Sequence, residues 1–209
     1  MRALVVANGD APSSSLLREL GGAADVIVAA DGGAHAALAA GLRVDMAVGD
    51  LDSLASDARV SLGDRILLRA DPHRTDLQKA VDYCIERGCG EIDIAAAGGG
   101  RADHALANLA LLTLSRGKAR IRIVDDLFEV SLVEGTAVVD APPGTVVSLV
   151  AIGECRGVST SGLRWDLDRT TLDFSPRGIH NEVESSPATV TLDSGDLLLF
   201  RGRWVEKHG

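Results

Sequence analysis

Hydrophobic and polar positions follow two alternating periods over the first 125 residues. Short apolar or β-branched runs are separated by Ala- and Leu-rich segments in which apolar residues recur at helical spacing. This alternation predicts successive strand–helix units and a mostly parallel sheet with flanking helices. The expected strands are residues 2–8, 25–30, 45–49, 65–70, 91–97 and 119–124, and the expected helices are 13–20, 33–41, 53–62, 75–88 and 101–117.

The pattern changes after Asp125. From residue 127 to 207, short alternating segments are separated by Gly, Pro and Asp, and no stretch of helical period remains. Such a run is typical of an all-β sandwich or a small barrel. We therefore predict two domains, 1–126 and 127–209. The expected strands of the second are 128–135, 136–144, 145–153, 157–167, 187–195 and 196–205.

The amino-acid composition, above all its net charge, limits which classes of binding partner are expected. Hydrophobic residues make up 46% of the chain, aromatic residues only 3%, and the net charge is −9. A nucleic-acid-binding domain would carry a basic surface, so we expect no nucleic acid as partner. A nucleotide bound with a divalent cation stays compatible with the acidity, because the cation reverses the local field.

The cysteines and the first residues indicate a cytoplasmic protein. Cys84, Cys89 and Cys155 form no C-x-x-C pair, so we expect reduced thiols. The opening MRALVVANGD has one positive charge and a short apolar run, which indicates a first strand rather than a secretion signal. No run reaches the ~18 apolar residues of a membrane span, so no membrane partner is expected.

Acidic or glycine-rich sequence follows five of the six strands expected in the first domain. In an open parallel sheet, ligands bind outside the carboxyl ends of the strands. Mg²⁺ is the cation that such a group of carboxylates usually binds. The alternative is that these residues are acidic only because Asp favours loops and helix starts. The positions concerned are Asp31, then Asp50 and Asp52, then Asp71, then residues 98–100, then Asp125 and Asp126.

Asp50 and Asp52 flank one leucine in the segment DMAVGDLDSL. In extended backbone, side chains two positions apart point to the same side, roughly 7 Å apart. Both carboxylates would then reach one metal ion or adjacent ions on phosphates. The alternative is turn chemistry, with Asp52 or Ser53 capping a helix that begins at Leu54.

The segment RTDLQKAVDY predicts a helix start with a charged pair. Thr75 and Gln78 have the spacing of a capping box, and Asp76 and Lys79 share one helix face. A helix N-terminus attracts phosphate, which Lys79 would also bind. The alternative for Asp76 and Lys79 is a surface ion pair.

The run GGGRADHALAN joins an expected strand to an expected helix. Glycines such as Gly99 and Gly100 let backbone N–H groups approach a ligand, and Arg101, Asp103 and His104 crowd the first turn of the helix. A flexible turn before a capped helix is the alternative. The chain has neither a P-loop nor a dinucleotide-binding glycine motif.

Two segments of the second domain carry polar and aromatic side chains of interest, GLRWDL with Trp165 and RGIHNE with His180 and Asn181. A tryptophan on a strand usually lies in the core, but its flat ring also suits stacking on a planar ligand. For His180 alone, a structural role is the more ordinary interpretation.

Taken in order, five segments resemble the thiamine pyrophosphokinase family: DGGAHAALAAGLRVDMAVGDLDS, RTDLQKA, GGGRADHALAN, GLRWDL and IHNE. The resemblance implies an α/β nucleotide-binding domain followed by a β-sandwich. It further implies that diphosphate passes from ATP to the thiamine hydroxyl with Mg²⁺ as cofactor. Homodimers are implied too, with thiamine between the first domain of one subunit and the second domain of its partner.

The resemblance also implies roles for individual residues. Asp50, Asp52 and Asp76 would organise Mg²⁺ and activate the alcohol, with Asp76 or Asp52 as the base. The residues that would bind nucleotide or substrate are Asp31, Thr75, Lys79, Gly99, Gly100, Arg101, Asp103 and His104, with Trp165, His180 and Asn181 at the thiamine pocket.

Two positions depart from the family pattern. Arg74 stands where a lysine is common, and His180 stands where a serine is usual. The second departure affects the acceptor pocket, so another heterocyclic alcohol, such as a hydroxymethylpterin, is an alternative acceptor. A regulatory module that binds nucleotide or thiamine without turnover is a further alternative.

Overall fold

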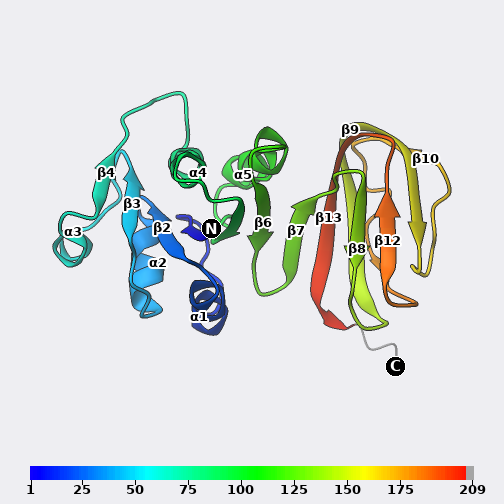
Figure 1. Ribbon diagram of the computed structural model, residues 1–209, viewed down its shortest axis with the longest axis horizontal. Helices are drawn as coiled ribbons and strands as arrows, with labels where there is room; N and C mark the ends of the chain where they lie inside the picture. The colour runs from blue at the N-terminus through cyan, green and yellow to red at the C-terminus, as the bar shows by residue number, and fades with distance from the viewer. Residues whose placement is uncertain (206–209) are drawn as a thin grey trace. The chain divides into compact units, whose positions relative to one another are not determined.

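Figure 1 shows the computed structural model, which describes residues 1–205. The chain divides into two compact units, Met1–Asp126 and Leu127–Gly209. The division falls where the sequence pattern changes from mixed to alternating. Residues 206–209 of the predicted second domain lie outside the described part of the chain.

The first unit is a mixed α/β structure on a parallel sheet. Its strand order is β4-β3-β2-β1-β5-β6, and every neighbouring pair is parallel. The apolar runs form these strands because most of their side chains are buried. The strands are β1 (Arg2–Val6), β2 (Val26–Ala30), β3 (Met46–Gly49), β4 (Ile66–Leu68), β5 (Glu91–Ala95) and β6 (Arg120–Val124).

Helices cover both faces of this sheet. Leu4 and Val6 of β1 belong to a core cluster that includes Leu17, Ala37 and Leu62 from three helices. In Figure 1, α1 and α2 lie on one side of the strands, and α4 and α5 lie on the other. The helices are α1 (Ser14–Gly22), α2 (Gly33–Ala39), α3 (Ser56–Leu62), α4 (Asp76–Glu86) and α5 (Ala102–Leu114).

The second unit consists of antiparallel strands around a separate core of Val and Leu side chains. Among its described strands, β9 pairs with four others, namely β13, β11, β12 and β10. The strands are β7 (Phe128–Leu132), β8 (Thr136–Val139), β9 (Thr145–Ser161), β10 (Thr170–Leu172), β11 (Asn181–Glu182), β12 (Ala188–Thr191) and β13 (Ser194–Val205).

The predicted turn at Gly153 is wrong, because β9 continues through it. Gly153 and Gly157 take φ angles of +80° and +64°, which glycine adopts without steric cost. The pairing of β9 with β13 shifts register in the same region. The two glycines therefore accommodate an irregular, bent strand instead of ending it.

Among the residues that the structure describes, no helix is both long and apolar enough to cross a membrane.

Candidate active site

Three carboxylates of the first unit converge at one edge of the parallel sheet. Asp31 follows β2, Asp50 follows β3, and Asp76 is the first residue of α4. One oxygen from each lies within 4.8 Å of the others. The carboxyl ends of neighbouring parallel strands meet at the same edge, which brings Asp31 and Asp50 together. We call Asp31, Asp50 and Asp76 the acidic cluster.

Backbone amides of the loop after β3 hold the acidic cluster in place. The Asp50 amide donates to Asp76 Oδ1 at 3.1 Å, and the Ser53 amide donates to Asp31 Oδ2 at 3.2 Å. Gly49 makes the approach of the two elements possible. A Cβ at Gly49 would lie 3.0 Å from Asp76 Oδ1 and 3.1 Å from Asp31 Cβ, tighter than an ordinary contact.

Asp31 is the buried member of the acidic cluster. Burial raises the pKa of its carboxyl group, hydrogen bonds from Ser53 oppose the rise, and the charges of Asp76 and Asp52 add to it. Its Oδ1 is buried without a hydrogen-bond partner in the described structure, which is costly. A hard cation with oxygen ligands would satisfy that atom, so the residues present fit Mg²⁺.

Lys79 places a buried positive charge beside the acidic cluster. Its side chain is 4% exposed, and Nζ lies 2.9 Å from Asp76 Oδ1. The predicted alternative of a surface ion pair is therefore wrong. The predicted helix start is confirmed, because Thr75 Oγ1 accepts a hydrogen bond from the Gln78 amide at 3.2 Å.

Asp52 lies apart from the position that the sequence predicts. Leu51 has a φ of +67°, so the backbone between the two aspartates is not extended, and the reason for expecting both carboxylates on one side is lost. Asp52 Oδ1 accepts from Ser53 Oγ at 3.0 Å, and Asp31 takes its place in the acidic cluster. The capping alternative is also wrong, because α3 begins at Ser56 after Ala55, with no side-chain cap.

The glycine turn before α5 forms as expected. Gly99 and Gly100 take φ angles of +80° and +59°, in the left-handed region that favours glycine. Arg101 Nη2 pairs with Asp103 Oδ2 at 2.6 Å on the surface, and its hydrogen bond lowers the pKa of Asp103 to about 2. Arg101 and Asp103 thus pair with each other rather than with the acidic cluster, and His104 is exposed beside them.

Sequence reasoning missed three side chains near this edge. His35 Nε2 accepts a hydrogen bond from the Ala55 amide at 3.3 Å, which ties α2 to the loop after β3. Asn8 and Asp10 follow β1, and Cβ atoms at Gly32 and Gly99 would lie 2.6 Å and 2.1 Å from their side chains. The polar sequence after the first strand was the available signal for Asn8 and Asp10.

Trp165 of the second unit lies in the loop after β9 and not on a strand, so of its two interpretations the place in the core is wrong. Its side chain is 54% exposed. Asn181 holds its backbone from both sides, with Oδ1 accepting from Trp165 N at 3.2 Å and Nδ2 donating to Trp165 O at 2.8 Å. The Arg164 guanidinium lies 5.0 Å from the ring centroid. The backbone at Trp165 is therefore held on both sides, and the indole is exposed at the surface.

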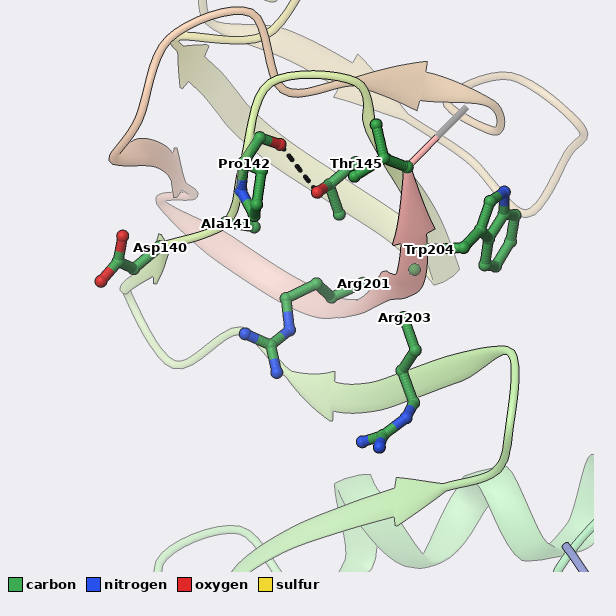
Figure 2. A pocket seen from close by; sticks show the side chains of 9 residues that line it. Asp140, Ala141, Pro142, Thr145, Arg201, Arg203 and Trp204 are labelled. Atoms are coloured by element: carbon green, nitrogen blue, oxygen red, sulfur yellow. Dashed lines mark hydrogen bonds between the residues drawn. The ribbon is translucent and has the colours of Figure 1, made fainter. Parts of the chain in front are cut away.

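His180 precedes Asn181 in a left-handed conformation, with a φ of +59°. Its amide donates to Ser148 Oγ at 2.9 Å, and the residue is exposed. Trp165, His180 and Asn181 do not line the pocket of the second unit shown in Figure 2. That pocket, of about 280 Å³, lies between the β8–β9 turn and β13 and is lined by Asp140, Pro142, Thr145, Arg201, Arg203 and Trp204, among others.

Together these features define a mixed α/β protein with an acidic, cation-compatible site at the carboxyl edge of a parallel sheet and a separate antiparallel β unit. Residues 17–124 match the family model for the thiamin pyrophosphokinase catalytic domain. Residues 136–197 match the model for the thiamin pyrophosphokinase vitamin B1 binding domain. The chain belongs to the thiamin pyrophosphokinase family.

Individual relatives agree with this assignment. Thiamine pyrophosphokinase 3 of Oryza sativa subsp. japonica is 31% identical over 74% of this chain, which spans 64% of that protein. Thiamine pyrophosphokinase of Bacillus subtilis is 26% identical over 83% of this chain and 86% of its own. The crystal structure of a thiamine pyrophosphokinase from Bacillus subtilis superposes with a TM-score of 0.85 at 23% identity, over 97% of this chain and 99% of that one, which shows the fold.

Proposed function

We propose that this protein transfers a diphosphate group from ATP to the hydroxyl of thiamine, giving thiamine diphosphate and AMP. The observation that carries the proposal is the convergence of Asp31, Asp50 and Asp76, with Lys79 beside them, at the sheet edge of a chain of this family. Binding alone would not require a buried carboxylate without a hydrogen-bond partner.

Asp31, Asp50 and Asp76 would hold Mg²⁺. The ion would supply positive charge that offsets the phosphoryl oxygens as charge shifts between them. This assignment moves Asp31 from the nucleotide-binding set to the metal set. Lys79 fixes Asp76 through its ion pair and adds positive charge at the N-terminus of α4, where phosphate also meets free backbone amides.

We assign the general base to Asp52. Asp76 Oδ1 already accepts hydrogen bonds from the Asp50 amide and from Lys79 Nζ, so this oxygen is engaged in holding the loop after β3 and the lysine. The Asp52 carboxylate is exposed next to the acidic cluster and can accept the proton of an incoming hydroxyl.

The remaining predicted residues complete the proposal. Thr75 and the turn at Gly99, Gly100, Arg101, Asp103 and His104 would bind the nucleotide. Trp165 would stack on the thiamine ring system, with Asn181 fixing its backbone and His180 beside it. We also propose that the antiparallel unit is a β-sandwich, that the protein is a cytoplasmic homodimer, and that thiamine binds between subunits.

The test measures AMP release from Mg·ATP with and without thiamine, with chromatographic separation of the products. Thiamine-dependent AMP with an equal amount of thiamine diphosphate supports the proposal. AMP release that does not depend on thiamine, or ATP binding without AMP release, contradicts it. In that case a hydroxymethylpterin and other heterocyclic alcohols become the acceptors to assay.

A further inference from the structure

Helix α4 ends in a Schellman motif that places two cysteines side by side. The Cys89 amide donates to the Cys84 carbonyl at 3.0 Å, and the Gly88 amide donates to the Ile85 carbonyl at 2.9 Å. Gly88 takes the left-handed φ of +81° that this motif requires. In a Schellman motif the residues that occupy the positions of Cys84 and Cys89 make a side-chain contact, usually between two hydrophobic groups.

Here that contact is made by two thiols. Cys84 and Cys89 are 0% and 2% exposed, and each thiol influences the pKa of the other, which places the two groups close together. Burial raises the pKa of the Cys84 thiol to about 12, and the neighbouring Cys89 adds to the rise. In the closed native state both groups are therefore protonated and protected from reagents.

We propose that Cys84 and Cys89 are a thiol modification site that small organic disulfides convert reversibly to an intrachain disulfide. One thiolate attacks the reagent and releases its first thiol, and the second cysteine then attacks the mixed disulfide and releases the other. One S–S bond forms in the protein and one breaks in the reagent. Two electrons pass to the reagent, and the two cysteine protons end on the released thiols.

The second step is favoured by the placement of the two residues. A mixed disulfide on either cysteine has the other cysteine as its neighbour in the motif, so ring closure is intramolecular. The first step requires the end of α4 to open, which the last turn of a helix does more readily than the core. Asp76 and Lys79 lie at the opposite end of α4, so the modification leaves the acidic cluster intact.

The experiment uses the full chain and oxidised glutathione as the probe, over hours at mildly alkaline pH. Acid quenching, alkylation with N-ethylmaleimide and trypsin digestion follow. Trypsin cleaves at Arg87, between the two cysteines, so the proposed disulfide would join peptides 80–87 and 88–101. We expect this joined pair, lighter by two hydrogens than the separate peptides, and its separation by dithiothreitol.

Matched variants locate the bond. Cys155→Ser removes a thiol of the second unit and leaves the joined pair, whereas Cys89→Ser removes it. The oxidised wild type is expected to melt a few degrees higher than the reduced form, because the bond constrains the unfolded chain. Glutathione adducts without the joined pair, a bond to Cys155, unmodified peptides at equilibrium, or a lower melting temperature would each overturn the proposal.

Discussion

Lys79 Nζ lies 2.9 Å from Asp76 Oδ1, and the lysine side chain is almost completely buried while the carboxylate is partly exposed. A buried ammonium is costly unless it is paired, and Asp76 provides the pair. The same oxygen accepts the amide of Asp50. Lys79 thereby connects the body of α4 to the loop after β3, and it partly offsets the repulsion within the acidic cluster.

Replacing Lys79 with methionine keeps the aliphatic stem and removes the charge. We expect kcat to fall about 100-fold or more, comparable to the loss of one preorganised donor in other enzymes. Lys79→Arg is expected to recover only part, because a guanidinium does not fit the same buried space. Lys118→Met, at an exposed lysine, is the control. Normal turnover in Lys79→Met would show that Lys79 does not contribute to catalysis.

Asp50→Asn and Asp52→Asn should separate metal binding from proton transfer. Asp50 belongs to the acidic cluster, so its variant should need at least tenfold more Mg²⁺ for half-maximal activity. Asp52 lies outside the acidic cluster, so its variant should lower kcat about 100-fold at an unchanged Mg²⁺ requirement. Magnesium titrations of both, with Asp64→Asn as control, decide between the roles. Equal shifts in both variants would contradict the assignment.

Gly49→Ala tests whether the acidic cluster depends on close approach. The added methyl group would press on Asp76 Oδ1 and Asp31 Cβ, so the two carboxylates must separate. We expect a loss of about 1–3 kcal/mol in the free energy of unfolding and a tenfold or larger fall in kcat/KM. Gly22→Ala, where the new Cβ meets nothing within 4 Å, should leave both nearly unchanged. Urea denaturation and steady-state assays provide the measurement.

Asn181→Ala should affect the thiamine side of the reaction alone. The change removes both side-chain hydrogen bonds to the Trp165 backbone, so the loop that carries the indole is held less firmly. The expected result is a roughly tenfold rise in KM for thiamine, equivalent to about 1.4 kcal/mol, with KM for ATP unchanged. An equal rise in KM for ATP would show that the loop at Trp165 serves the nucleotide instead.

The three buried cysteines predict a pH effect on stability. Burial holds the pKa of Cys84 at about 12, above its ordinary value of 9.0. The unfolded chain therefore loses the Cys84 proton first, so the contribution of this thiol to stability is constant below about pH 9 and declines as the pH rises toward 12. Urea midpoints from pH 7 to 10.5 should fall in the wild type and fall less in Cys84→Ser. Rapid thiol titration at pH 8 should detect three groups only after unfolding.

Buried apolar runs made the strands of the first unit predictable, because most of their side chains face protein on both sides of the sheet. Their ends were less predictable. The apolar run of β5 continues to Ala97, but the strand stops at Ala95 because Ala96 takes a φ of +57°. Single backbone angles of this kind leave no periodic signal.

Single backbone angles also limited the prediction of the candidate active site. Asp50, Asp76 and Lys79 were identifiable from their positions at a strand end and a helix start. The exchange of Asp52 for Asp31 depends on the left-handed turn at Leu51, a residue type that rarely adopts it. In the second unit, Trp165 lies on a loop because β9 ends at Ser161, and the strand pattern of GLRWDL did not reveal this.

The pairing of strand β9 also predicts how the second unit unfolds. The strand is 17 residues long and pairs with β13, β12, β10 and β11, so each of these strands loses a partner when β9 detaches. β13 and β12 each pair with one further strand, β7 and β8, so their detachment disturbs those strands too, whereas β10 and β11 pair with β9 alone. The amides of β9 in the regular pairing with β13, Val147–Ile152, are therefore expected to exchange their hydrogens only when the whole unit unfolds, with one common free energy of opening. Folding is expected to be slow, because the pairing of β9 with β13 joins residues that are far apart in the chain.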